Sequence, residues 1–222
     1  MDGGTTAAME LRAALDAAKG GSASRVPLGD AGRVALAEAL AWPDASAALW
    51  MLEFAPDGLC VAVAPRATPG PVTVSELMLG EHERLDALGT AMAAIVEGSG
   101  PDVLAAWNAF AAGLTRHIRV EESVLFPLLE PAAGPVGGPT TLTRIEHRAL
   151  EHLLELGTRA LARCRLVLDD SASREAFLRV HRQLGDTLRT HHLREDQELY
   201  PLADGLLTPE RRDAILRRTV LF

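Results

Sequence analysis

Two stretches of the chain repeat each other, and this repeat restricts the possible folds more than any other feature. Residues 117–128 read HIRVEESVLFPL, and residues 191–202 read HHLREDQELYPL. The segments before them also match, with GEHERLDAL at residues 80–88 and IEHRALEHL at residues 145–153. We therefore expect two helical hairpins of the same design, which face each other and bring matched side chains close to one axis.

Helical patterns occupy the chain from Thr73 onwards. Thr73 and Glu76 have the spacing of a capping box, and Pro101 suits the first turn of a helix. We expect four long helices at residues 73–98, 101–130, 140–168 and 172–203, and a short helix at residues 208–218. The prediction is a mainly α protein, in which residues 73–222 form an up-down four-helix bundle with a short C-terminal helix.

Residues 1–70 differ in character and are expected to form a small α+β region whose role the sequence does not indicate. Helices are expected at residues 8–19 and 31–41, and short apolar runs at residues 48–54 and 59–64 are expected to be strands. Pro56-Asp57-Gly58 separates the two runs. This sequence favours a hairpin, because proline presets one turn dihedral and glycine adopts the positive one.

Composition argues against two classes of partner. The net charge is −8 and no segment is strongly basic, which excludes a nucleic-acid-binding face. No stretch approaches the ~20 apolar residues of a membrane span.

Cys60 and Cys164 lack metal-binding spacing and are expected to be free thiols in a reducing compartment. The N-terminus does not have the pattern of a signal peptide, so we expect a cytoplasmic protein.

The repeated HxxxE spacing places a histidine and a glutamate on one helix face. Positions i and i+4 differ by about 40° around the axis and ~6 Å along it, so His117 and Glu121 leave the same side of their helix. Apolar residues extend that face, and His191 with Glu195 repeats the arrangement. A buried glutamate without a partner is unfavourable, and the neighbouring arginines point elsewhere. A bound cation is the simplest compensation, and imidazole with carboxylate suits iron, manganese or zinc.

Two further histidines complete the set. His82 lies between the apolar residues Met78 and Leu85, and His147 occupies the matching position of the repeat. Four inward histidines and two glutamates are too many ligands for one tetrahedral zinc ion. They are a natural number for two ions that both carboxylates bridge, with room for a small molecule.

The ordered combination H, HxxxE, H, HxxxE, with FP or YP after each HxxxE, resembles the hemerythrin-like, or HHE cation-binding, family over residues 74–203. The residues that carry the resemblance are His82, His117, Glu121, His147, His191 and Glu195. The resemblance implies a four-helix bundle around a non-haem di-iron centre, bridged by two carboxylates and an oxygen atom. It also implies binding of dioxygen, nitric oxide, peroxide or iron itself.

The chain departs from the oxygen-carrying members of that family in its third helix, where they have two histidines four residues apart. Here the residue four after His147 is Glu151, the better-placed candidate for that ligand position, while His152 would need a helical distortion. A carboxylate there argues against a reversible oxygen carrier. Asp86, four residues after His82, is a candidate to contact a metal ligand without binding the metal itself.

Three other residues near the repeat are expected to lie outside the metal site. His181 is expected to have a structural role in the core. His192 is expected to lie at the surface, or to contact the ligands without binding the metal. Tyr200 aligns with Phe126 and is expected mainly to pack, although its hydroxyl could tune the site.

Three classes of function fit these residues. The first is a di-iron protein that binds a small ligand for sensing, storage or delivery. The second is a di-iron enzyme that disproportionates peroxide or reduces nitric oxide, and the third is an iron-responsive interaction module in which the metal organises the bundle.

Overall fold

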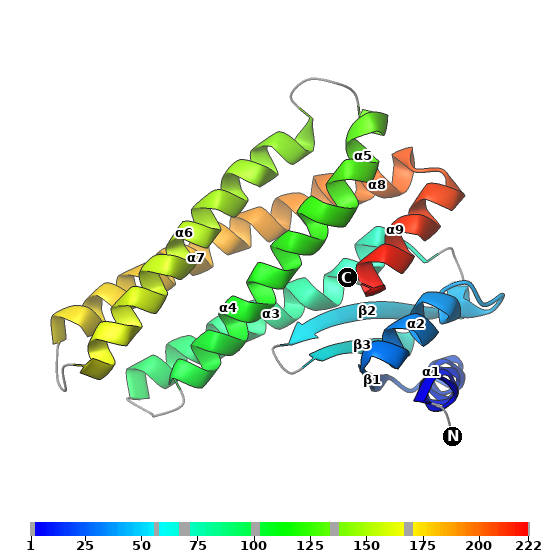
Figure 1. Ribbon diagram of the computed structural model, residues 1–222, viewed down its shortest axis with the longest axis horizontal. Coiled ribbons are helices and arrows are strands. Elements are labelled where there is room, and N and C mark those ends of the chain that lie inside the picture. Colours follow the sequence, from blue (N-terminus) through cyan, green and yellow to red (C-terminus); the bar gives the residue numbers. More distant parts are fainter. Residues whose placement is uncertain are drawn as a thin grey trace.

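The computed structural model describes residues 3–55, 58–66, 72–98, 103–133, 138–166 and 171–221 (Figure 1). The helices are α1 (Gly3–Lys19), α2 (Asp30–Ala39), α3 (Val74–Gly98), α4 (Val103–Val120), α5 (Phe126–Ala133), α6 (Pro139–Leu166), α7 (Ser171–Arg194), α8 (Tyr200–Leu206) and α9 (Pro209–Leu221). The strands are β1 (Ser24–Leu28), β2 (Ala48–Ala55) and β3 (Gly58–Pro65). The short turns are the 3₁₀ turn η1 (Ala45–Ala47) and the π-helical turns η2 (Glu121–Leu125) and η3 (Glu195–Leu199).

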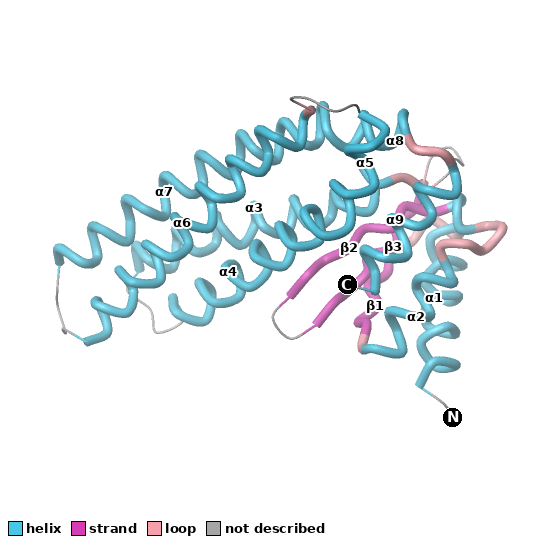
Figure 2. Tube along the Cα trace, turned by 45° about the horizontal axis from the view of Figure 1, so that its top comes forward, coloured by secondary structure: helices cyan, strands magenta, loops and turns pink. Residues whose placement is uncertain are grey.

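The long helices α3, α4, α6 and α7 run alongside one another, and α5 and α8 extend α4 and α7 (Figures 1 and 2). This arrangement confirms the expected mainly α fold with several long helices after residue 73. The start of α3 has the predicted capping box, in which the Thr73 amide donates to Glu76 and the Glu76 amide donates to the Thr73 hydroxyl. Asp204 of α8 accepts hydrogen bonds from the amides of Val74 and Ser75, which ties α8 to the start of α3.

The second and fourth long helices each contain a π-helical turn at the equivalent place. Each turn begins at a predicted ligand, Glu121 or Glu195, and ends two residues before a proline, Pro127 or Pro201. Proline has no amide hydrogen and its ring clashes with the carbonyl four residues earlier. The wider π turn relieves that conflict, so the helical conformation continues beyond both prolines.

The N-terminal region is a three-stranded antiparallel sheet with helices, and its strand order is β1-β3-β2. The β2–β3 hairpin was predicted, although its turn residues Pro56 and Asp57 lie outside the described residues. Strand β1 was not predicted, because SRVPL is short and contains Pro27. Proline suits an edge strand, which is where β1 lies.

Buried apolar residues form two cores, and the first one joins the N-terminal region to the bundle. It combines Trp50 and Val61 of the sheet with Phe126, Tyr200 and residues of α9. The second core lies within the far part of the bundle and includes Leu85, Leu114 and Leu188. Along α3, α4 with η2, and α7 with η3, the predicted metal ligands fall between residues of the first core and residues of the second, so a polar layer separates two apolar ones.

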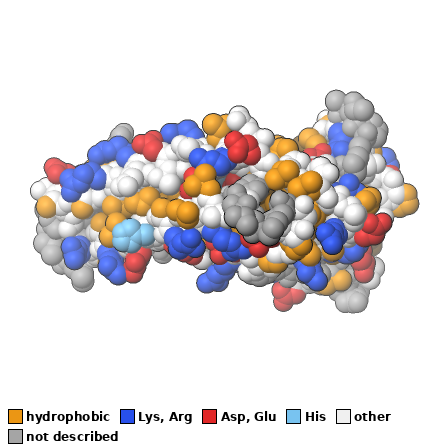
Figure 3. Space-filling view, turned by 90° about the horizontal axis from the view of Figure 1, so that it is seen from above, with side chains coloured by type: hydrophobic (Ala, Val, Ile, Leu, Met, Phe, Trp, Pro, Cys, Tyr) orange, Lys and Arg blue, Asp and Glu red, His pale blue; other side chains and the backbone are white. Residues whose placement is uncertain are grey.

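The described helices include none that is both long and apolar enough to cross a membrane. Basic and acidic side chains are interspersed along the face of the molecule seen in Figure 3.

Candidate metal centre

Six predicted ligands from four helical segments meet in the polar layer. The four histidines come from α3, α4, α6 and α7, and the two glutamates begin the π turns η2 and η3. Each is at most 2% exposed, although glutamate is almost never fully buried without a partner and histidine is only intermediate in burial. The members of this set are His82, His117, Glu121, His147, His191 and Glu195.

The histidines form two pairs, and Glu195 faces both. In the His82 pair, the Nε2 atoms of His82 and His117 are 3.3 Å apart, and Glu195 Oε2 lies 3.3 Å from His82 Nε2. In the His147 pair, made of His147 and His191, Glu195 Oε1 lies 3.2 Å from His191 Nε2. Two ligands at right angles on one ion, each ~2.1 Å from it, are about 3 Å apart. Each pair with its carboxylate oxygen therefore has the spacing of ligands that share a cation.

Glu121 also lies between the two pairs. Its Oε2 atom is 3.0 Å from His147 Nε2 and 3.6 Å from His117 Nε2. Its Oε1 atom accepts a hydrogen bond of 2.6 Å from the Tyr200 hydroxyl, on the side of His82. Both carboxylates are thus placed to contact two cations at once.

The inward atoms of this cluster are buried but make no hydrogen bond within the described structure. They are Nε2 of His147, His191 and His192, Oε2 of Glu121, and both carboxylate oxygens of Glu195. Buried polar atoms are nearly always paired, and leaving a charged one unpaired is costly. Lone pairs that converge on one space without donors fit a bound cation, so the residues present match the requirements of a metal centre.

Carboxylates behind the histidines fix the direction of those lone pairs. The Nδ1 atoms lie 2.9 Å from Asp196 for His82, 2.9 Å from Glu122 for His147, and 3.1 Å from Glu146 for His191. A carboxylate on one ring nitrogen keeps the proton there and presents the other nitrogen to a metal. Sequence reasoning missed these groups, although each ligand glutamate is followed directly by an acidic residue, Glu122 or Asp196.

The profile of the family described as Hemerythrin HHE cation binding domain matches residues 73–203. The match covers more than half of the chain. This protein belongs to the hemerythrin HHE cation-binding family. Comparisons with curated proteins and with solved structures return no match.

This HHE domain does not bring the predicted ligand Glu151 into the cluster. Glu151 and His152 are both exposed on α6. The buried line of α6 runs through Thr143, His147 and Leu150. His147 is at the edge of this face, and a further step of about 40° carries Glu151 beyond it. The structure therefore corrects the expectation that the residue four after His147 supplies the additional ligand position.

A fifth histidine, His192, lies beside His82 and His117, on the other side of the cluster from the position that sequence reasoning considered for Glu151. His192 is 3% exposed, its ring stacks on His82 with centroids 3.8 Å apart, and its Nδ1 lies 3.1 Å from Asp86. His82, His117 and His192 form a group that could hold a metal ion, and His117, Glu121, His191 and Glu195 form a second one. Of the two places expected for His192, the surface is wrong, because its side chain is buried among the predicted ligands. His181 lies elsewhere, where its Nε2 contacts the Gly89 carbonyl oxygen at 3.1 Å in a structural role.

The electrostatics of the protein groups prepare the HHE centre for a cation. Burial holds the pKa of His82 and of His117 well below the usual range, and burial lowers the pKa of His191 to about 4. These histidines are neutral at pH 7 and have a free lone pair. Burial opposes protonation of His147 too, but Glu121 and Glu195 outweigh it and raise its pKa to about 10, so a cation that binds here replaces a proton on His147. Burial, followed by the charge of Glu121, raises the pKa of Glu195 well above its ordinary value.

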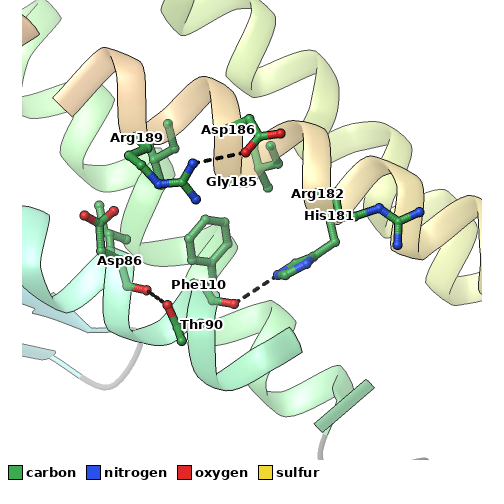
Figure 4. Close-up of a pocket in the computed structure, with 12 residues that line it drawn as sticks. Asp86, Thr90, Phe110, His181, Arg182, Gly185, Asp186 and Arg189 are labelled. Atoms are coloured by element: carbon green, nitrogen blue, oxygen red, sulfur yellow. Dashed lines mark hydrogen bonds and ion pairs between the residues drawn. The ribbon is translucent and has the colours of Figure 1, made fainter. Parts of the chain in front are cut away.

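A pocket of about 530 Å³ lies next to the centre, between α3 and α7 (Figure 4). Leu85, Phe110 and Leu188 give it an apolar wall, and the exposed pair Arg189–Asp186 lies at its rim. Its wall also includes Asp86, the carboxylate that contacts His192. One side chain thus separates this pocket from a histidine of the cluster.

Proposed function

We propose that this protein is a non-haem di-iron protein that binds dioxygen, nitric oxide or peroxide for sensing, storage or detoxification. The position of Glu195 carries the proposal. Its Oε2 atom is 3.3 Å from His82 Nε2, and its Oε1 atom is 3.2 Å from His191 Nε2. A carboxylate with one oxygen toward each of two histidine groups is the arrangement that bridges two ions in helical bundles.

The chemistry of the donors supports iron over the other candidate ions. Imidazole nitrogen and carboxylate oxygen suit iron, manganese and zinc, and neither described metal group includes a cysteine. Zinc generally takes four ligands in a closed tetrahedron, whereas this cluster offers five histidines and two carboxylates that lie between them. Bound iron would supply an ion that can change oxidation state and accept a small exogenous ligand.

The two sides of the cluster are unequal, and this inequality supports a preferred place for that ligand. The His82 side has three histidines, His82, His117 and His192, whereas the His147 side has two, His147 and His191. Phe126 stacks flat on His147, with centroids 5.7 Å apart, and limits water there. We infer that the small ligand binds on the His147 side, where fewer protein donors compete.

The pocket between α3 and α7 supports a route by which such a ligand reaches the centre. Its inner wall is apolar and suits small uncharged molecules, and it reaches Asp86 beside His192, so a ligand that enters here passes from the His82 side to the His147 side of the cluster. Gly185 lies in its wall, and a side chain there would extend into open space.

The test is the response of the iron-loaded protein to gases. Metal-free protein is loaded with ferrous iron under anaerobic conditions, and ultraviolet-visible spectra are recorded before and after dioxygen or nitric oxide is added. We expect two irons per chain and a spectral change with each gas. Glu151→Gln should respond like the wild type because Glu151 is exposed, whereas Glu195→Gln should not respond.

Other outcomes would assign the protein to the alternative classes. Iron-loaded protein whose spectrum ignores both gases would exclude the proposed function. Steady oxygen release from peroxide, lost in Glu195→Gln, would indicate an enzyme. Unfolding on chelation without any gas response would indicate a module that uses its metal structurally.

A further inference from the structure

The hydroxyl of Tyr200 lies inside the metal cluster, where a residue that only packs would not place it. Tyr200 is fully buried, and its oxygen is 2.6 Å from Glu121 Oε1 and 3.1 Å from His82 Nε2. The second distance is close to the 3.3 Å between the Nε2 atoms of His82 and His117. The phenolic oxygen is therefore about as far from His82 Nε2 as the Nε2 atom of His117 is.

The π turn η3 explains how Tyr200 reaches this position. On an uninterrupted α-helix, Tyr200 would lie about 140° around the axis from Glu195, away from the cluster. A π turn adds one residue to a helical turn, which rotates the following residues back by about 100°. The turn spans Glu195–Leu199, so Tyr200 is the first residue to be redirected toward His82.

The repeat contains an internal comparison for Tyr200. Phe126 follows the equivalent turn η2 and stacks on His147 with an interplanar angle of 5°, whereas Tyr200 is tilted by 34° against His82. The two halves of the bundle thus use the same aromatic position differently. The half with Phe126 places a ring over its histidine, and the half with Tyr200 adds an oxygen atom between His82 and Glu121.

We propose that Tyr200 binds the metal ion at the His82 pair through its phenolic oxygen, an inference that rests on the proposed metal centre. An oxygen–metal bond forms, the O–H bond breaks, the proton passes to solvent, and no electron moves. The protein donors of that ion then number six, which is an octahedral set. They are His82, His117, His192, Tyr200, one oxygen of Glu121 and one oxygen of Glu195.

This ligand set makes the two ions chemically different. Tyr200 is fully buried and contacts the Glu121 carboxylate, so its phenolate forms only where a cation compensates its charge. An anionic oxygen favours the ferric over the ferrous state of the ion that it binds. Six protein donors also leave no position for an exogenous ligand at the His82 pair, which confines ligand binding to the His147 side.

The chain permits a clean test because Tyr200 is its single tyrosine. We expect ferric-loaded protein to show a visible phenolate-to-iron charge-transfer band, with tyrosinate ring modes enhanced in the resonance Raman spectrum at that band. Tyr200→Phe should lose both signals but keep two irons per chain and the far-ultraviolet circular dichroism of the wild type. The variant should fold, because the repeat already has phenylalanine at the equivalent position, Phe126.

Wild-type protein with two bound irons and no tyrosinate signal would overturn this inference, and would show that Tyr200 only donates a hydrogen bond to Glu121. A tyrosinate signal without any response to gases would overturn the proposed function and leave the ligand assignment intact. Zinc is a second probe if iron does not load. Zinc binding to metal-free protein should produce the ultraviolet difference spectrum of tyrosinate, absent in Tyr200→Phe, and a failure to bind zinc as well would overturn both proposals.

Discussion

At the scale of single residues, the cluster is a set of groups that burial makes unfavourable unless a cation joins them. Glu195 is 1% exposed and neither of its oxygens accepts a hydrogen bond in the described structure. Glu121, whose charge raises the pKa of Glu195, lies beside it. Without a bound cation, the carboxylate of Glu195 therefore lowers the stability of the folded protein, although the same carboxylate is needed to bind the metal.

Glu195→Gln should stabilise the metal-free protein at neutral pH while it abolishes tight metal binding. The folded-state pKa of Glu195 is raised, so its contribution to stability is complete below about pH 4.5, the ordinary value, and is lost as the pH rises through the folded pKa. The variant should gain about 1–3 kcal/mol over the wild type at pH 7. Urea unfolding of both proteins without metal should show a gap that widens as the pH rises, and a constant gap would contradict this account.

Glu146→Gln should weaken metal binding by about 10- to 100-fold, because the carboxylate that orients a ligand histidine is lost. Glu146 contacts His191 Nδ1 at 3.1 Å and also pairs with Arg194. The matched control is Glu151→Gln, the same change five residues further along α6 at an exposed position. Titration of both metal-free variants with ferrous iron should show normal affinity for the control, and equal losses would restore Glu151 as a ligand.

At the scale of elements, helical periodicity predicted the bundle and the convergence of six buried residues, but failed where helices depart from an ideal geometry or a single buried face. The repeat placed His117 and Glu121 on one face before η2 begins. Tyr200 follows η3, where the period of 3.6 residues no longer holds. His192 was misplaced for another reason, because α7 contacts both α6 and α3 and so buries a face wide enough for two adjacent histidines.

Gly157→Ala should destabilise the protein by about 1–3 kcal/mol, because the added carbon would overlap the rigid ring of Trp107 where α6 packs on α4. Gly185→Ala in α7 is the matched control. No described atom lies within 4 Å of its added carbon, so it should gain about 0.5–1 kcal/mol from the higher helix propensity of alanine. Thermal unfolding of both variants measures the difference, and similar melting temperatures would show that α6 and α4 are less closely packed.

At the scale of the whole molecule, the region before residue 70 and the bundle share one apolar core, which includes Trp50, Phe126 and Tyr200. The sequence predicted two separate regions because Pro65, Pro69, Gly70 and Pro71 interrupt the pattern between them. A local composition break does not reveal that Gly80 of α3 lies against Met51 of β2, which depends on long-range packing.

Metal loading should therefore slow amide hydrogen exchange in β2 and β3 together with α3 and α7. A shared core transmits the stability gained at the metal centre to the sheet. Hydrogen exchange with and without bound iron, read by mass spectrometry on peptides from both regions, checks this. If metal slows amide exchange only in residues after 73, the N-terminal region and the bundle are independent units.

Gly185→Leu should slow both association and dissociation of nitric oxide several-fold in iron-loaded protein and leave the equilibrium affinity unchanged. The leucine fills the α3–α7 pocket and obstructs a route without touching the ligand site. Flash photolysis measures both rates, with Gly185→Ala as the control. Unchanged rates would exclude this pocket as the route.

Two iron ions side by side between the histidine pairs would be visible by anomalous X-ray diffraction from crystals of iron-loaded protein. We expect two iron peaks about 3.5–4 Å apart, one beside His82 and His117 and the other beside His147 and His191, with Glu195 between them. A single peak, or iron found away from these residues, would contradict this expectation.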